Sequence, residues 1–182
     1  FTFTEINFNK DKNNLMKVII KPVKGRYPGM QETRRYELRL PLTVQPEMIK
    51  INGQTINFKE DATADSWNYN GNELSTQIFT DKLNVHQQVE IEIKFTEYEI
   101  GLLSSKKGKI DRLIKFMKFL AKTNWDKSKY SNDKVVHAAQ TGHRLSMNPK
   151  NAISEMQSFD SNWKDIIKMI ESYSVENSKY IP

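Results

Sequence analysis

The chain has 182 residues, of which 37% are hydrophobic, so it can form one ordinary domain or two small ones and is not disordered. It holds no cysteine, which excludes disulfide bonds and thiolate metal sites. No apolar run approaches the roughly 20 residues of a membrane span. The net charge of +6 belongs to the second half: residues 1–100 carry 13 Lys and Arg against 14 Asp and Glu, and residues 101–182 carry 15 against 8.

The first half of the chain shows the two-residue period of β-strands. Val89, Ile91 and Ile93 alternate with charged residues, which is the pattern of a strand with one buried face. We expect strands over residues 1–6, 15–21, 33–40, 48–51, 55–58, 67–69, 74–79 and 89–95. Seven or eight short strands with short turns predict an antiparallel β-sandwich domain over residues 1–99.

Three turn signals separate these strands. Pro28-Gly29 fits the middle of a β-turn, because proline has a fixed φ and glycine accepts a positive one. Asn52-Gly53 and Asn70-Gly71 favour hairpin turns, the first as a two-residue type I′ turn. The predicted core consists of Val18, Ile20, Tyr36, Leu38, Leu40, Ile49, Ile51, Trp67, Tyr69, Ile78, Ile91 and Ile93.

After Gly101 the apolar period becomes that of helices, which predicts a small helical domain over residues 100–182. One amphipathic helix is expected over residues 110–121, and a shorter one over residues 132–140 that Gly142 stops. Asn148-Pro149 marks the start of further helix over residues 149–173. The weak helix formers at 160–162 leave open whether that segment is one helix or two. The fold class is therefore α+β.

An ordered set of turn and strand residues in the first half resembles the distal C-terminal β-domain of glycoside hydrolase family 31. The set consists of Gly25, Tyr27-Pro28-Gly29, Arg35-Tyr36, Pro46, Ile49, Asn52-Gly53, Trp67 and Tyr69. Domains of this family usually open with an acidic, Asp- and Gly-rich stretch, which is missing before Phe1. We therefore expect the chain to be a piece of a longer protein.

The resemblance implies a parent enzyme that hydrolyses α-glucosides or α-xylosides with retention. Such enzymes use two carboxyl groups about 5–5.5 Å apart, and in this family both lie in a (β/α)8 barrel whose motifs this chain does not contain. We expect no catalytic residue, metal or cofactor in the chain itself. The resemblance implies that the chain's partner is the catalytic barrel. The chain would buttress this barrel and restrict which molecules reach its active site. The residues leave the compartment open, and a periplasmic or secreted parent agrees with the resemblance.

Two binding functions are alternatives. An exposed platform of Tyr27, Trp67 and Tyr69 would stack on an oligosaccharide, although two aromatic residues on one strand face usually belong to a core. A basic helix face could track the phosphates of a nucleic acid or lie on a membrane, although a lysine-rich outer face also keeps a bundle helix soluble. The residues of that face are Lys109, Arg112, Lys115, Lys118 and Lys122. A free-standing carbohydrate-binding module and, after it, a nucleic-acid-binding module are therefore the competing functions.

Overall fold

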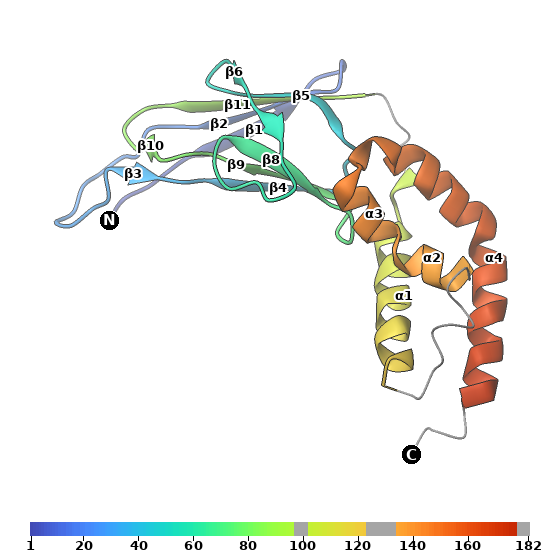
Figure 1. The fold of residues 1–182 in the computed structure, drawn as a ribbon. Helices are drawn as coiled ribbons and strands as arrows, with labels where there is room; N and C mark the ends of the chain where they lie inside the picture. The colour runs from blue at the N-terminus through green and yellow to red at the C-terminus, as the bar shows by residue number, and fades with distance from the viewer. Residues whose placement is uncertain (97–101, 123–133, 178–182) are drawn as a thin grey trace. The chain divides into compact units, whose positions relative to one another are not determined.

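The structure is a computed structural model that describes residues 1–96, 102–122 and 134–177. The chain forms two compact units, of which the first holds Phe1–Tyr69 and Ser75–Tyr98 and the second holds Asn70–Leu74 and Glu99–Pro182. Sheets make up the first unit and helices most of the second (Figure 1). The predicted α+β class, strands followed by helices, is confirmed.

The first unit contains two main sheets and a short two-stranded one. The five-stranded sheet has the order β1-β2-β11-β5-β6, the four-stranded sheet β4-β9-β8-β7, and β10 pairs with β3. The described strands are β1 (Ile6–Lys10), β2 (Leu15–Ile20), β3 (Thr33–Arg34), β4 (Glu37–Pro41), β5 (Pro46–Ile51), β6 (Gln54–Thr55), β7 (Asn57–Phe58), β8 (Ser66–Asn70), β9 (Ser75–Phe79), β10 (Leu83–Asn84) and β11 (Val89–Phe95). Figure 1 shows the two main sheets as the two layers of a sandwich.

Strand β11 organises the larger sheet, because it pairs antiparallel with both β2 and β5. Ile91 lies opposite Val18 on one side, and Ile93 lies opposite Ile49 on the other. These four side chains are at most 5% exposed. Alternation of apolar and charged residues therefore places one face of the sheet in the core, as the sequence pattern predicts.

The structure divides the first half into more strands than predicted, eleven among the described residues. The strand expected over residues 33–40 is interrupted at Tyr36, whose backbone N–H donates to Thr80 Oγ1 at 2.9 Å. The strand expected over residues 55–58 is interrupted at Ile56, where the chain crosses from β6 in the larger sheet to β7, which pairs in parallel with β8. The first strand covers Ile6–Lys10 instead of residues 1–6.

The predicted core is correct in most of its members, which are buried, and wrong in three. Tyr36, Leu38 and Leu40 are only half-buried. Leu38 and Leu40 belong to β4, which lies at the end of the four-stranded sheet, so they have a neighbouring strand on one side only. An edge position explains why alternation alone overestimated their burial.

The helical unit contains α1 (Lys106–Leu120), α2 (Lys134–Ala139), α3 (Thr141–Met147), a 3₁₀ turn (Pro149–Asn151) and α4 (Ala152–Asn177) among the described residues. Helix α2 ends at Ala139, close to the predicted end at residue 140, but Gly142 is not its stop, because this glycine lies inside the next helix, α3. A Cβ atom there would lie 2.0 Å from Asn72 Oδ1, so glycine serves close packing at this position. Helix α4 runs without a break through Asp160, which settles the alternative left open by the sequence.

Candidate functional site

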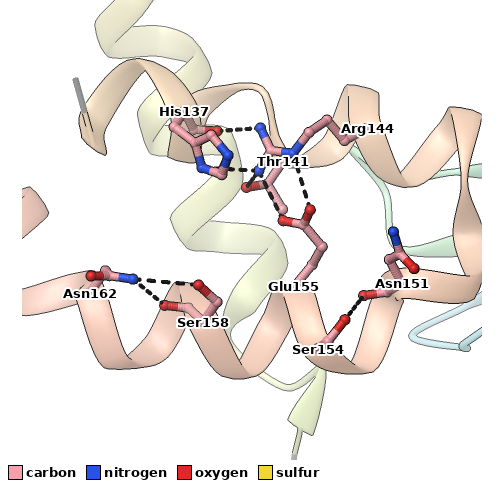
Figure 2. A network of polar contacts seen from close by, with 8 residues as sticks. All are labelled: His137, Thr141, Arg144, Asn151, Ser154, Glu155, Ser158 and Asn162. Carbon is pink, nitrogen blue, oxygen red and sulfur yellow. Dashed lines mark hydrogen bonds and ion pairs between the residues drawn. The ribbon is translucent and has the colours of Figure 1, made fainter. Parts of the chain in front are cut away.

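A partly buried ion pair between two helices lies at the centre of the candidate site (Figure 2). Arg144 of α3 donates from Nε to Glu155 Oε1 at 3.1 Å and from Nη2 to Glu155 Oε2 at 2.9 Å. The side chains of Arg144 and Glu155 are 28% and 21% exposed. This bidentate geometry is the strong form of an arginine–carboxylate contact, so it fixes α3 against α4.

The remaining donors of Arg144 hold the end of α2 and the start of α3. Nη1 donates to the backbone carbonyl oxygen of His137 at 2.7 Å, and Nη2 donates to Thr141 Oγ1 at 3.1 Å. Nη2 also lies 3.3 Å from His137 Nδ1.

The ion pair keeps Glu155 ionised. Hydrogen bonding from Arg144 lowers the pKa of Glu155 below its ordinary value, and this outweighs the burial that would raise it. The positive charge of Arg144 acts in the same direction as its hydrogen bonds. A carboxylate held in this way is a poor proton donor near neutral pH, so the arrangement suits positioning and binding better than acid catalysis.

A cavity of about 270 Å³ lies beside the ion pair. Its apolar floor is formed by Ala138, Phe159 and Ile166, each at most 5% exposed. Its polar wall is formed by Lys134, His137, Gln140, Thr141, Arg144, Glu155, Ser158 and Asn162. A small concave site with an apolar floor and a few polar groups is the usual form of a ligand site.

The aromatic residues predicted as a sugar platform do not form one. Trp67 is 5% exposed and Tyr69 is 2% exposed, whereas Tyr27 is 47% exposed. Trp67 packs edge-on against Phe58 with ring centroids 5.0 Å apart, and the Tyr69 hydroxyl donates to the carbonyl oxygen of Thr43 at 2.7 Å. Trp67 and Tyr69 are core residues, because strand β8 presents them to the inside of the sandwich.

The predicted basic helix face is only partly free. Lys109 lies 3.2 Å from an Asp160 oxygen and 4.8 Å from the ring centre of Trp163, so its charge is engaged within the unit. Its neighbours Lys106 and Lys107 are also ion-paired. The other members of the face, Arg112, Lys115, Lys118 and Lys122, are exposed and have no ion-pair partner in the described part of the chain.

Sequence reasoning missed the residues of the candidate site. Arg144 and Glu155 lie on either side of Asn148-Pro149, where the sequence predicts the start of a helix, so they belong to different segments and no single helix pairs them. Gly142 was expected to end the helix, and this placed Arg144 in a connecting segment. The sequence offers only a weak signal, which is a basic residue a few positions before a helix and an acidic residue in the first turn of that helix.

Among the described residues, no group of three or more His, Asp or Glu side chains is placed to hold a metal ion. Within the same part of the chain, no helix combines the length and the apolar character needed to cross a membrane. Comparison with models of known protein families gave no match. A search of curated proteins also found no significant relative.

Proposed function

We propose that this chain is the non-catalytic C-terminal accessory part of a family 31-like α-glycosidase. The observation that carries the proposal is the structural use of the residues on which the resemblance rests. Most of them form turns or core contacts in the first unit, which is what a scaffold signature requires. Residues that serve only the scaffold support a buttressing role rather than a catalytic one.

The glycines of the pattern occupy positions that favour glycine. Gly25 has φ 89°, and a Cβ atom there would lie 2.5 Å from the backbone oxygen of Phe1. Gly29 has φ 80° in the turn after Pro28. Asn52 and Gly53 have φ values of 49° and 83°, the left-handed pair that a type I′ hairpin needs between β5 and β6.

The apolar members of the pattern lie in the sandwich. Ile49 is 1% exposed and pairs across the sheet with Ile93, and Pro46 is buried at the start of β5. Trp67 and Tyr69 complete the opposite layer. An ordered set of residues with these roles specifies one sandwich design, so it supports a relationship with a domain that shares the pattern.

In the proposed role, the first unit buttresses a catalytic (β/α)8 barrel supplied by the same parent protein. The two carboxyl groups that hydrolyse an α-glucosidic or α-xylosidic bond with retention would belong to that barrel. The accessory part would support the barrel and restrict what reaches its active site. A periplasmic or secreted parent is the expected setting.

The test compares the full-length parent protein with this chain alone, using nitrophenyl α-glucoside and α-xyloside. We expect turnover from the parent and none above buffer from the isolated chain. Steady turnover by the isolated chain would overturn the non-catalytic role. A parent gene that encodes no glycosidase barrel would overturn the family assignment.

Nucleic-acid binding is a second candidate, favoured by an exposed basic stripe of Arg112, Lys115 and Lys118 on α1 and Lys122 just after it. It ranks lower because the lysines before this stripe are neutralised by acidic residues of the same unit. Binding of this kind is strongly weakened by salt, since phosphate contacts release counterions. Retention on a DNA column that falls steeply with salt, and that a Lys115→Ala/Lys118→Ala variant lacks, would support this candidate.

A further inference from the structure

We propose that the cavity between α2, α3 and α4 is a binding site for a neutral, polyhydroxylated ligand with the size of one sugar ring. Its volume is about 270 Å³. Sites for drug-sized molecules usually measure about 300–1,000 Å³, so this cavity suits something smaller. A single six-membered ring with hydroxyl substituents meets that limit.

The charges around the cavity are already balanced, and this argues against an anionic ligand. Each of the three guanidinium nitrogens of Arg144 donates to an acceptor within the unit, and Glu155 supplies the counter-charge. Lys134, the other cation of the wall, lies 2.8 Å from an Asp165 oxygen. An incoming phosphate or carboxylate would have to break one of these ion pairs before it gained a partner.

The wall nevertheless offers unused hydrogen-bonding groups. Thr141 is 2% exposed, and its oxygen accepts from Arg144, so its hydroxyl hydrogen remains available. In the part of the chain that the structure describes, His137 Nε2 and the side-chain amide of Gln140 have no hydrogen-bond partner. Donors and acceptors therefore occur together, which matches a ligand whose hydroxyl groups both donate and accept.

The floor of the cavity complements the carbon face of such a ligand. Phe159 and Ile166 are 4% and 1% exposed, and Phe159 is held in place by stacking on Trp163 with ring centroids 5.4 Å apart. A sugar ring has one face formed mainly by C–H groups, which packs on apolar and aromatic surfaces while its hydroxyl groups reach the wall. Cyclic polyols therefore fit better than flexible polar chains.

The choice of sugars among neutral cyclic polyols rests on the proposed function, whereas the cavity chemistry does not. The parent would release glucose or xylose, and a site in the helical unit would bind the product or a sugar of the substrate away from the barrel. Binding and turnover are separate measurements. Sugar binding can therefore fail while the parent remains an active glycosidase, and the reverse can also occur.

The test is an NMR titration of the full 182-residue chain with glucose, xylose and maltose, and separately with inorganic phosphate. We expect saturable shifts of backbone amides at His137–Thr141 and Glu155–Asn162 with at least one sugar. Gln140→Ala and Thr141→Val should each weaken binding about fivefold or more, the equivalent of one net hydrogen bond. Gln157→Ala removes an exposed amide of α4 that does not line the cavity, and it should bind like the original chain.

Absence of saturable shifts with every sugar would overturn the proposal. Tighter binding of phosphate than of any sugar would do the same, because it would show an anion site. Gln140 is exposed, so its variant should fold normally, and it keeps the test decisive if Thr141→Val proves unstable. Sugar affinity that is unchanged in a folded Gln140→Ala variant and in Thr141→Val would also contradict this assignment.

Discussion

The ammonium group of Lys106 at the start of α1 lies 2.5 Å from a carboxylate oxygen of Asp160 in α4. The Lys106 side chain is only 8% exposed, and Lys109 approaches the other oxygen of Asp160 at 3.2 Å. Burial would raise the pKa of Asp160, but hydrogen bonds from Lys106 and Lys109 outweigh it and hold this pKa below its ordinary value. One carboxylate therefore compensates two cations where the helices meet.

The two partners of this ion pair should respond differently to substitution. Asp160→Asn leaves Lys106 buried without its counter-charge, and we expect the free energy of unfolding to fall by about 1–3 kcal/mol, discounted from a fully buried pair because Asp160 is partly exposed. Lys106→Met removes the buried charge and leaves Asp160 paired with Lys109, so it should cost less than about 1 kcal/mol. Urea unfolding measures both, and a larger loss for Lys106→Met would contradict the reasoning.

The close packing around Gly71 and Gly142 predicts that a larger residue at position 142 lowers the stability of the chain. A Cβ atom on Gly71 would lie 2.0 Å from the backbone oxygen of Gly142, and one on Gly142 would lie 2.9 Å from the backbone nitrogen of Asn72. Gly142→Ala should therefore destabilise the chain by about 1–3 kcal/mol, as overpacking does. Gly108→Ala is the matched control, because α1 has open space there and alanine should stabilise the helix by about 0.5–1 kcal/mol. Thermal unfolding that ranks these variants in the opposite order would refute this account.

The Arg144–Glu155 contact predicts a loss of stability in acid. Because the folded-state pKa of Glu155 lies below 4.5, its stabilising contribution is present above that pH and is lost as the pH falls through the lower folded value. The pKa values of Asp160 and Asp165 are also lowered, from an ordinary 3.8, so their contributions are present above that pH and are lost as the pH falls through the lower folded values. Glu155→Gln should make the pH dependence of unfolding shallower below about pH 4.5. An unchanged slope in denaturant titrations from pH 6 to pH 3 would exclude this contribution.

Alanine substitutions of a buried and an exposed aromatic residue test whether Trp67 belongs to the core of the sandwich. Trp67 is 5% exposed, so Trp67→Ala should lower the free energy of unfolding by about 3–5 kcal/mol. Tyr27 is 47% exposed, and Tyr27→Ala should change it by less than about 0.5 kcal/mol. A well-tolerated Trp67→Ala variant that loses sugar binding would restore the platform hypothesis.

Local sequence patterns predicted the strands well, but they did not predict which residues the helices contact. Strand β11 was predicted with its observed bounds, because a two-residue period is a local property that one buried face enforces. Helix propensity alone could not predict that α4 continues through Asp160-Ser161-Asn162. Asp160 forms ion pairs with Lys106 and Lys109 of α1. The Ser161 hydroxyl and the Asn162 amide both donate to the carbonyl oxygen of Ser158. Tertiary contacts and bonds back to the helix thus override weak helix propensity.

The candidate site was hidden from the sequence for a related reason. Gly142 looks like a helix stop because glycine often ends helices, yet its role is to let the backbone near Asn72 approach. In the structure Gly142 lies inside α3, and this helix brings Arg144 to Glu155. The decisive information is a contact between positions about 70 residues apart, which no periodicity within one segment encodes.

The loop Asn70–Leu74 has a consequence for how the chain can be divided. It connects two strands of the sandwich, but it belongs to the helical unit, where Gly71 N–H donates to Ser146 Oγ at 2.9 Å. Leu74 is fully buried with φ 48°, a left-handed conformation that leucine rarely adopts without tertiary support. The helical unit is therefore discontinuous in sequence. A gene cut after residue 98 would separate the helices from Asn70–Leu74, which belongs to the same unit. Recombination can therefore transfer the helical unit intact only together with this loop.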